Sequence, residues 1–145
     1  AQEDNWNIPI GLESWFKNKV GDYVINGRID RLDLLPDKTI EIIDYKTGKS
    51  KDKLTSEDKE QLLLYQIAVE EIAEFRNYGQ PSKLTFYYLN DEIKQSFIGE
   101  PKELEKLKAK LAHTIKQITS GDFTATPSQF VCGHCDFRDI CEFRA

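Results

Sequence analysis

Two stretches of the chain, 27–33 and 39–48, have the alternation of polar and hydrophobic residues that is typical of extended strands. Because strand side chains alternate between the two faces of a sheet, the second stretch sends its even-numbered residues to one face. These residues are Ile40, Ile42, Asp44 and Lys46. The turn-like segment 35–38 joins the two stretches, so the pattern predicts one β-hairpin.

The register of this hairpin brings two carboxylates together. If residues 36–38 form a three-residue loop, paired positions add up to 74 and Asp30 lies opposite Asp44. At about 5 Å, the distance of cross-strand neighbours, two unit charges repel by roughly 3 kcal/mol at an effective dielectric of 20. A divalent cation would offset this repulsion, and with the ammonium of Lys46 such a site suits Mg²⁺ holding a phosphate ester. The alternative is a solvated face whose acids are offset by nearby arginine and lysine side chains.

Further strands and helices are expected on both sides of the hairpin. Residues 13–20 are expected to turn at Gly21-Asp22 into a long strand, 23–34, which gives a three-stranded meander. The later elements are a helix from about Thr55 to Tyr78, strands 83–89 and 93–98, and a helix opened by Pro101 with the buried stripe Leu104, Leu107, Leu111, Ile115 and Ile118. This order predicts an α/β domain with helices packed on a sheet.

The first predicted helix carries two polar groups that face the same way. Gln61 and Tyr65 are four residues apart, which stacks them on one helix face. A tyrosine on such a helix more often packs in the core with a satisfied hydroxyl than contacts a ligand. The pair alone therefore indicates little.

Length and composition favour one domain inside the cell. The chain has 145 residues, 39% of them hydrophobic, which suffices for one core, so residues 1–145 are expected to form a single domain. No run approaches the roughly 18 apolar residues of a membrane span, and the start lacks the order of a signal peptide. We therefore expect a soluble, cytoplasmic protein without membrane contact. The absence of methionine suggests a piece of a longer polypeptide or a trimmed start.

The charge is acidic overall but basic after the hairpin. A net charge of −5 argues against binding nucleic acid by bulk electrostatics. Lys46, Lys49, Lys51 and Lys53 form a local basic run that is suited to guiding a phosphate chain. The commoner meaning of such a run is a solvated, lysine-rich loop.

The tail, residues 123–145, contains all three cysteines, in a C-x2-C-x5-C arrangement. An odd number of thiols in an intracellular protein argues against disulfides, whereas this spacing favours a metal or an iron–sulfur cluster. His134 is too tightly placed to ligate beside its neighbours, so a fourth ligand is absent or lies before residue 1. The tail has few periodic apolar positions, and we expect Cys132, Cys135 and Cys141 to converge and pin it to the core. The alternative is three reduced thiols packed as small hydrophobes.

Together these residues resemble a nuclease family. The order Gly27-x-x-Asp30, Asp44-Tyr45-Lys46 and Gln61-x-x-x-Tyr65 is similar to the RecB-type branch of the PD-(D/E)xK nuclease superfamily, the C-terminal nuclease domain of helicase–nucleases. The cysteine tail resembles the iron–sulfur staple of AddB-like and CRISPR-associated relatives. The resemblance implies a restriction-endonuclease-like α/β core, with a mixed central sheet flanked by helices and the Cys-rich tail packed on it.

The resemblance also implies roles for the residues. It assigns Asp30, Asp44 and the Tyr45 carbonyl as ligands of Mg²⁺ or Mn²⁺, Lys46 as the catalytic lysine, Gln61 and Tyr65 as the border of the site, and Cys132, Cys135 and Cys141 as cluster ligands. A 4Fe-4S cluster in the full-length protein would need a fourth, upstream cysteine. The expected protein is a metal-dependent deoxyribonuclease for DNA repair, acting on DNA, expected to be single-stranded, with a helicase domain or subunit as partner and with sequence missing at its N-terminus.

Two other interpretations stay open. One is a catalytically inactive nuclease fold that guides DNA or contacts a subunit, and the intact set Asp30, Asp44 and Lys46 argues against it. The other is a zinc-tethered interaction domain, which accounts for the cysteines but leaves the hairpin unexplained. The sequence does not separate exonuclease from endonuclease activity.

Overall fold

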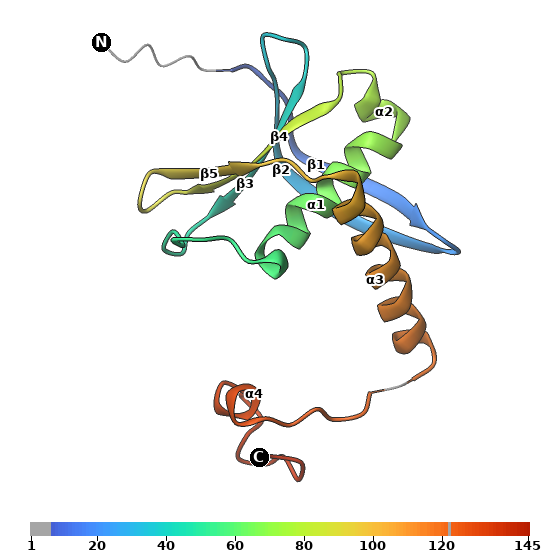
Figure 1. Ribbon diagram of the computed structural model, residues 1–145, viewed down its shortest axis with the longest axis vertical. Coiled ribbons are helices and arrows are strands. Elements are labelled where there is room, and N and C mark those ends of the chain that lie inside the picture. Colours follow the sequence, from blue (N-terminus) through green and yellow to red (C-terminus); the bar gives the residue numbers. More distant parts are fainter. Residues whose placement is uncertain (1–6, 122) are drawn as a thin grey trace. The chain divides into compact units, whose positions relative to one another are not determined.

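The computed structural model describes residues 7–121 and 123–145 (Figure 1). One compact unit ends at Ala112 and a second runs from His113 to Ala145. Within the described residues, five strands form one sheet: β1 (Pro9–Val20), β2 (Tyr23–Leu34), β3 (Ile40–Lys46), β4 (Pro81–Tyr88) and β5 (Ile93–Phe97). The helices are α1 (Ser56–Glu71), α2 (Ala73–Arg76), α3 (Pro101–Thr119) and α4 (Gln129–Gly133). We retain as a prediction that residues 1–145 form a single domain with the tail packed on it.

The sheet is mixed and follows the order of the sequence. Strands β1, β2 and β3 form the predicted antiparallel meander. Strand β4 runs parallel to β3, and β5 runs antiparallel to β4. A parallel neighbour requires a long crossover, and helices α1 and α2 supply it between β3 and β4.

The predicted hairpin register is confirmed. Arg31 pairs with Ile43 and Leu34 with Ile40, so paired positions add up to 74. The loop is closed by the Leu35 amide, which donates to the Thr39 carbonyl at 2.8 Å. Lys38, the last loop residue, has a φ of 64°, which matches a turn followed by one left-handed residue.

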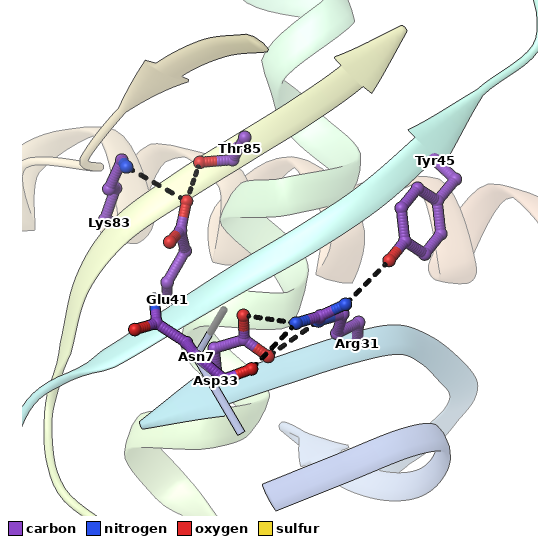
Figure 2. A network of polar contacts seen from close by, with 7 residues as sticks. All are labelled: Asn7, Arg31, Asp33, Glu41, Tyr45, Lys83 and Thr85. Atoms are coloured by element: carbon purple, nitrogen blue, oxygen red, sulfur yellow. Dashed lines mark hydrogen bonds and ion pairs between the residues drawn. The ribbon is translucent and has the colours of Figure 1, made fainter. Parts of the chain in front are cut away.

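The hydrophobic core lies on the face of the sheet that α1 covers. Ile40 and Ile42 of β3 point into it, and they are fully buried. Their core partners include Leu32 of β2, Leu84 and Phe86 of β4, Leu62, Ile67, Ala68 and Val69 of α1, and Leu104 and Leu107 of α3. Figure 2 looks onto the opposite face, with the helices behind the strands.

The start of α1 is fixed by a capping box. The Thr55 side chain accepts from the Asp58 amide at 3.2 Å, and the Asp58 carboxylate accepts from the Thr55 amide at 2.8 Å. This cap sets where the helix begins, and with it the positions of Gln61 and Tyr65 one and two turns later.

The predicted helix from about Thr55 to Tyr78 is broken at Ile72 into two helices, α1 and α2. Helix α1 ends at Glu71 because Ile72 is extended, with φ −83° and ψ 121°. The short helix α2 follows in a new direction and buries Phe75 in the core. No glycine or proline marks this break, so burial of Phe75 decides it rather than local propensity.

The stripe predicted on α3 is buried in part. Leu104 and Leu107 are buried, whereas Ile118 is 54% exposed. In the second unit, α4 begins at Ser128, whose Oγ accepts from the Val131 amide at 3.1 Å. Among the described residues, no helix combines the length and the apolar character needed to cross a membrane.

Candidate active site

Six predicted site residues are linked across β2, β3 and α1. The Tyr45 amide donates to Asp30 Oδ2 at 3.0 Å, which ties the first carboxylate to the strand that carries the second. Lys46 Nζ lies 2.7 Å from Asp44 Oδ2 and donates to Gln61 Oε1 at 2.7 Å. Gln61 Nε2 in turn donates to the Tyr65 hydroxyl at 3.0 Å. The hairpin and α1 therefore meet at one polar site.

Asp44 is a buried acid in unfavourable surroundings. Its residue is 2% exposed, and burial raises the pKa of its carboxyl above the ordinary value. The nearby Lys46 ammonium opposes this rise in pKa, and the Asp30 charge adds to it. Lys46 Nζ forms an ion pair with Asp44 Oδ2 at 2.7 Å, and no other described residue donates to this buried oxygen. One ammonium thus faces two carboxylates, and this excess of negative charge favours a further cation at the site.

On the opposite face of the sheet at β3, the acidic side chains have both hydrogen-bond and ion-pair partners (Figure 2). Arg31 donates to both carboxylate oxygens of Asp33, at 2.7 and 2.9 Å, and reaches the Tyr45 hydroxyl at 3.4 Å. Glu41 accepts from the Thr85 hydroxyl at 2.6 Å and pairs with Lys83 at 3.1 Å. The alternative interpretation, in which Arg28, Arg31 and Lys46 offset the two acids, is therefore wrong for Arg31, which pairs with Asp33 on the other face, but it holds for Lys46, which pairs with Asp44.

Comparison with known proteins identifies the family of this fold and site. The model of the PD-(D/E)XK nuclease superfamily matches residues 1–142. The chain belongs to this superfamily. Its five-stranded mixed sheet with flanking helices is the predicted restriction-endonuclease-like α/β fold.

The crystal structure of SSO0001 has a similar fold, with a TM-score of 0.55 and 21% sequence identity. The match covers 92% of this chain and 60% of the SSO0001 chain. At this identity the likeness concerns the fold alone. No curated protein matches the sequence.

The carboxylates of this superfamily member suit Mg²⁺. Asp30 and Asp44 offer hard oxygen atoms, and within the described residues Asp44 Oδ2 has the Lys46 ammonium as its one polar partner. In residues 7–121 and 123–145, no group of three or more histidine, cysteine, aspartate or glutamate side chains is arranged to hold a metal. A pair of carboxylates fits a magnesium ion, which keeps several waters and also takes oxygens of a bound phosphate.

Tyr65 closes the network on the helix side. Burial raises the pKa of its hydroxyl, and the Gln61 hydrogen bond partly offsets this rise. The charges of Asp44 and Asp30 raise the pKa further, so Tyr65 is a neutral hydroxyl near pH 7. Its ring packs edge-on against Phe16 at 5.8 Å, which fixes its direction.

The loop after β3 is held in place by the β4–β5 turn. Asn90 Nδ2 donates to the Thr47 carbonyl at 2.5 Å, and Asp91 Oδ2 accepts from the Ser50 amide at 2.6 Å. In the predicted basic run, Lys51 forms an ion pair with Asp58, and these two partners hold the pKa of Lys51 above and that of Asp58 below its ordinary value. Lys49, Lys51 and Lys53 are all exposed, and of these three Lys51 has an acidic partner among the described residues.

The predicted convergence of the three cysteines is not observed. In the described part of the chain, Cys132, Cys135 and Cys141 carry free thiols and form no metal-binding group. Cys132 is buried within α4, and its sulfur accepts from the Ala145 amide at 3.4 Å. Cys135 follows the end of that helix, which turns the thiols to different surroundings.

The sequence pattern indicated the residues that meet at this site, but not the partners of the acids on the opposite face of β3. The contacts of Arg31 and Glu41 were not foreseen. Their signal was present in the same period-two pattern, because the odd-numbered residues of β3 must face the side away from α1.

Proposed function

We propose that this domain hydrolyses phosphodiester bonds in DNA in a reaction that depends on a divalent cation. The observation that carries the proposal is the buried Asp44 carboxylate, which lies beside the like charge of Asp30 and has the Lys46 ammonium as its ion-pair partner. Asp33 and Glu41, on the same two strands, are held by hydrogen bonds. The fold therefore does not require a buried acid beside a like charge, as Asp44 is.

Asp30 and Asp44, with the Tyr45 carbonyl, would hold Mg²⁺ or Mn²⁺. When bound, the ion polarises the scissile phosphate and lowers the pKa of a coordinated water. The side chains of Asp30 and Asp44 are positioned for this by the hairpin register and by the hydrogen bond from the Tyr45 amide.

Lys46 would supply the positive charge that the phosphate needs. Its ammonium lies between Asp44 and Gln61 and also stands 5.1 Å from the centre of the Phe86 ring, so it is held in place. A lysine is suited to this role as a compact point charge that can donate to a phosphate oxygen or to the attacking water. Gln61 orients Lys46, and Tyr65 orients Gln61.

The wider role that we propose is nuclease activity within a helicase–nuclease, on single-stranded DNA, with a 4Fe-4S cluster completed by an upstream cysteine. Its support is the resemblance of the residue order and of the cysteine spacing alone. Anaerobic purification of the full-length protein with iron and sulfide analysis tests the cluster. Iron-free protein with stoichiometric zinc would contradict it.

The test of the nuclease function is cleavage of labelled DNA with and without Mg²⁺ by wild type and by Asp44→Asn. Loss of one of two metal-binding carboxylates should lower the rate by at least about 100-fold, in line with the several kcal/mol of charge stabilisation that a metal provides. The matched control is Asp52→Asn, the same substitution on an exposed loop, which should retain activity. Cleavage by Asp44→Asn at the wild-type rate would contradict the assignment.

A further inference from the structure

The β1–β2 hairpin has one buried face and one exposed face. Phe16, Asn18 and Val20 of β1 are buried, whereas the residues between them point outward. The register pairs Trp15 with Arg28, Lys17 with Asn26 and Lys19 with Val24, and all six of these residues are exposed. We call this set the outer hairpin face.

The outer hairpin face leaves a large aromatic ring in water. Trp15 is 72% exposed, although Phe16 next to it is 4% exposed. The Arg28 guanidinium lies over the indole at 5.6 Å from its centre, and Arg28 Nε pairs with Glu13 at 2.8 Å. Because β1 is an edge strand, the indole is accessible from the side, where a hollow of about 410 Å³ is bounded by Trp15, Phe16, Lys17 and Asn26.

The charge of this face differs from that of the chain. Arg28, Lys17 and Lys19 give it three cations, in a chain with a net charge of −5. An exposed aromatic ring with arginine and lysine around it is the combination that binds single-stranded nucleic acid, because the ring stacks on a base while the cations follow the phosphates. The bases of a duplex already stack on each other, so an intact duplex offers the indole no free base face.

The outer hairpin face and the candidate active site lie on opposite faces of the sheet. Phe16, whose side chain points away from that of Trp15, is buried and packs against Tyr65 of the active-site network. Because β1 is an edge strand, a DNA strand that stacks on Trp15 would pass around β1 to reach the other face.

We propose that the outer hairpin face is a stacking subsite for single-stranded DNA, in which Trp15 holds a base and Arg28, Lys17 and Lys19 hold phosphates. Its use in cleavage rests on the proposed nuclease function, whereas its affinity for a single strand does not. Binding without cleavage therefore tests it separately.

The experiment measures binding of labelled oligothymidylate to the full chain by fluorescence anisotropy in EDTA, where cleavage is off. Trp15→Ala should weaken binding by about 5-fold to 100-fold, which is the range expected for loss of one base–aromatic stack. Trp15→Phe should restore most of the affinity. Tyr78→Ala is the matched control, since Tyr78 is also an exposed aromatic residue, and it should bind as wild type does.

A second measurement does not depend on the Trp15 variants. The chain has two tryptophans, Trp6 and Trp15, so Trp6→Phe leaves Trp15 as the one indole emitter. Oligothymidylate should quench this emission, and a blunt duplex of equal length should quench it far less.

Equal affinity of wild type and Trp15→Ala for the single strand would overturn the proposal, as would equal quenching by the duplex. Loss of single-strand affinity in Trp15→Ala supports the subsite even if Asp44→Asn shows that the nuclease assignment is wrong. The opposite outcome is also distinguishable. If Asp44→Asn loses cleavage while Trp15→Ala binds as wild type does, the nuclease function is retained and the subsite is rejected.

Discussion

Strand β3 buries an acid on each of its faces, and the two acids have opposite surroundings. Glu41, 6% exposed, accepts from Thr85 and pairs with Lys83, and its neighbour Asp33 on β2 is held by both nitrogens of an arginine fork. Asp44, 2% exposed, pairs with Lys46 but also faces the like charge of Asp30, and no other described residue donates to its Oδ2.

This comparison separates structural acids from a candidate functional acid. Both kinds lie within a few residues of each other on the same two strands, so position in the sheet does not explain the difference. Proteins tolerate unsatisfied or repelling groups mainly where function requires them, and they satisfy such groups elsewhere. A bound cation is therefore expected to stabilise the face that carries Asp44, and not the face that carries Glu41.

The largest expected effect on stability is on the satisfied face. Asp33→Asn removes the charge that pairs with Arg31, whose side chain is 17% exposed. Removing one partner of a buried ion pair leaves an uncompensated charge and should cost about 3 kcal/mol of unfolding free energy. Urea unfolding measures this, with Asp22→Asn in the exposed β1–β2 turn as the control expected to change stability little. A change below about 0.5 kcal/mol in Asp33→Asn would show that the fork is dispensable.

On the face that carries Asp44, we expect a smaller change in unfolding free energy, and of opposite sign. In metal-free protein, Asp44→Asn removes both the buried charge and its repulsion with Asp30. The variant should therefore be more stable than wild type by about 1 kcal/mol, the range of a typical stabilising substitution. Destabilisation of metal-free protein by Asp44→Asn would mean that the Lys46 ion pair outweighs the cost of burial.

The difference in stability between wild type and Asp44→Asn should change with pH in a defined direction. Because burial raises the pKa of Asp44, the folded protein keeps this proton at pH values where the unfolded chain has released it. The stability of wild type relative to Asp44→Asn should be greatest below about pH 4, the ordinary value for aspartate, and should fall as the pH rises through the raised pKa. Urea titrations in EDTA at a series of pH values measure this, and a difference that grows with pH in favour of wild type would contradict it.

Much of the site was predictable from sequence because it depends on short-range rules. Loop length and strand alternation determine how Asp30 and Asp44 approach each other, and helix periodicity places Gln61 and Tyr65 together. The break at Ile72 was not predictable, since it follows from where Phe75 finds the core. The cysteine spacing suggested convergence, but spacing alone does not determine where a short helix turns each thiol.

The central claim is that the Asp30–Asp44 face is a cation site and the Glu41 face is not, and thermal unfolding with and without Mn²⁺ tests it most directly. A ligand that binds the folded state stabilises it, by about 2.7 kcal/mol at 100 times its dissociation constant. Wild type and Glu41→Gln should both unfold at higher temperature in Mn²⁺, whereas Asp44→Asn should show little change. Equal stabilisation of Asp44→Asn, or loss of stabilisation in Glu41→Gln, would contradict the account.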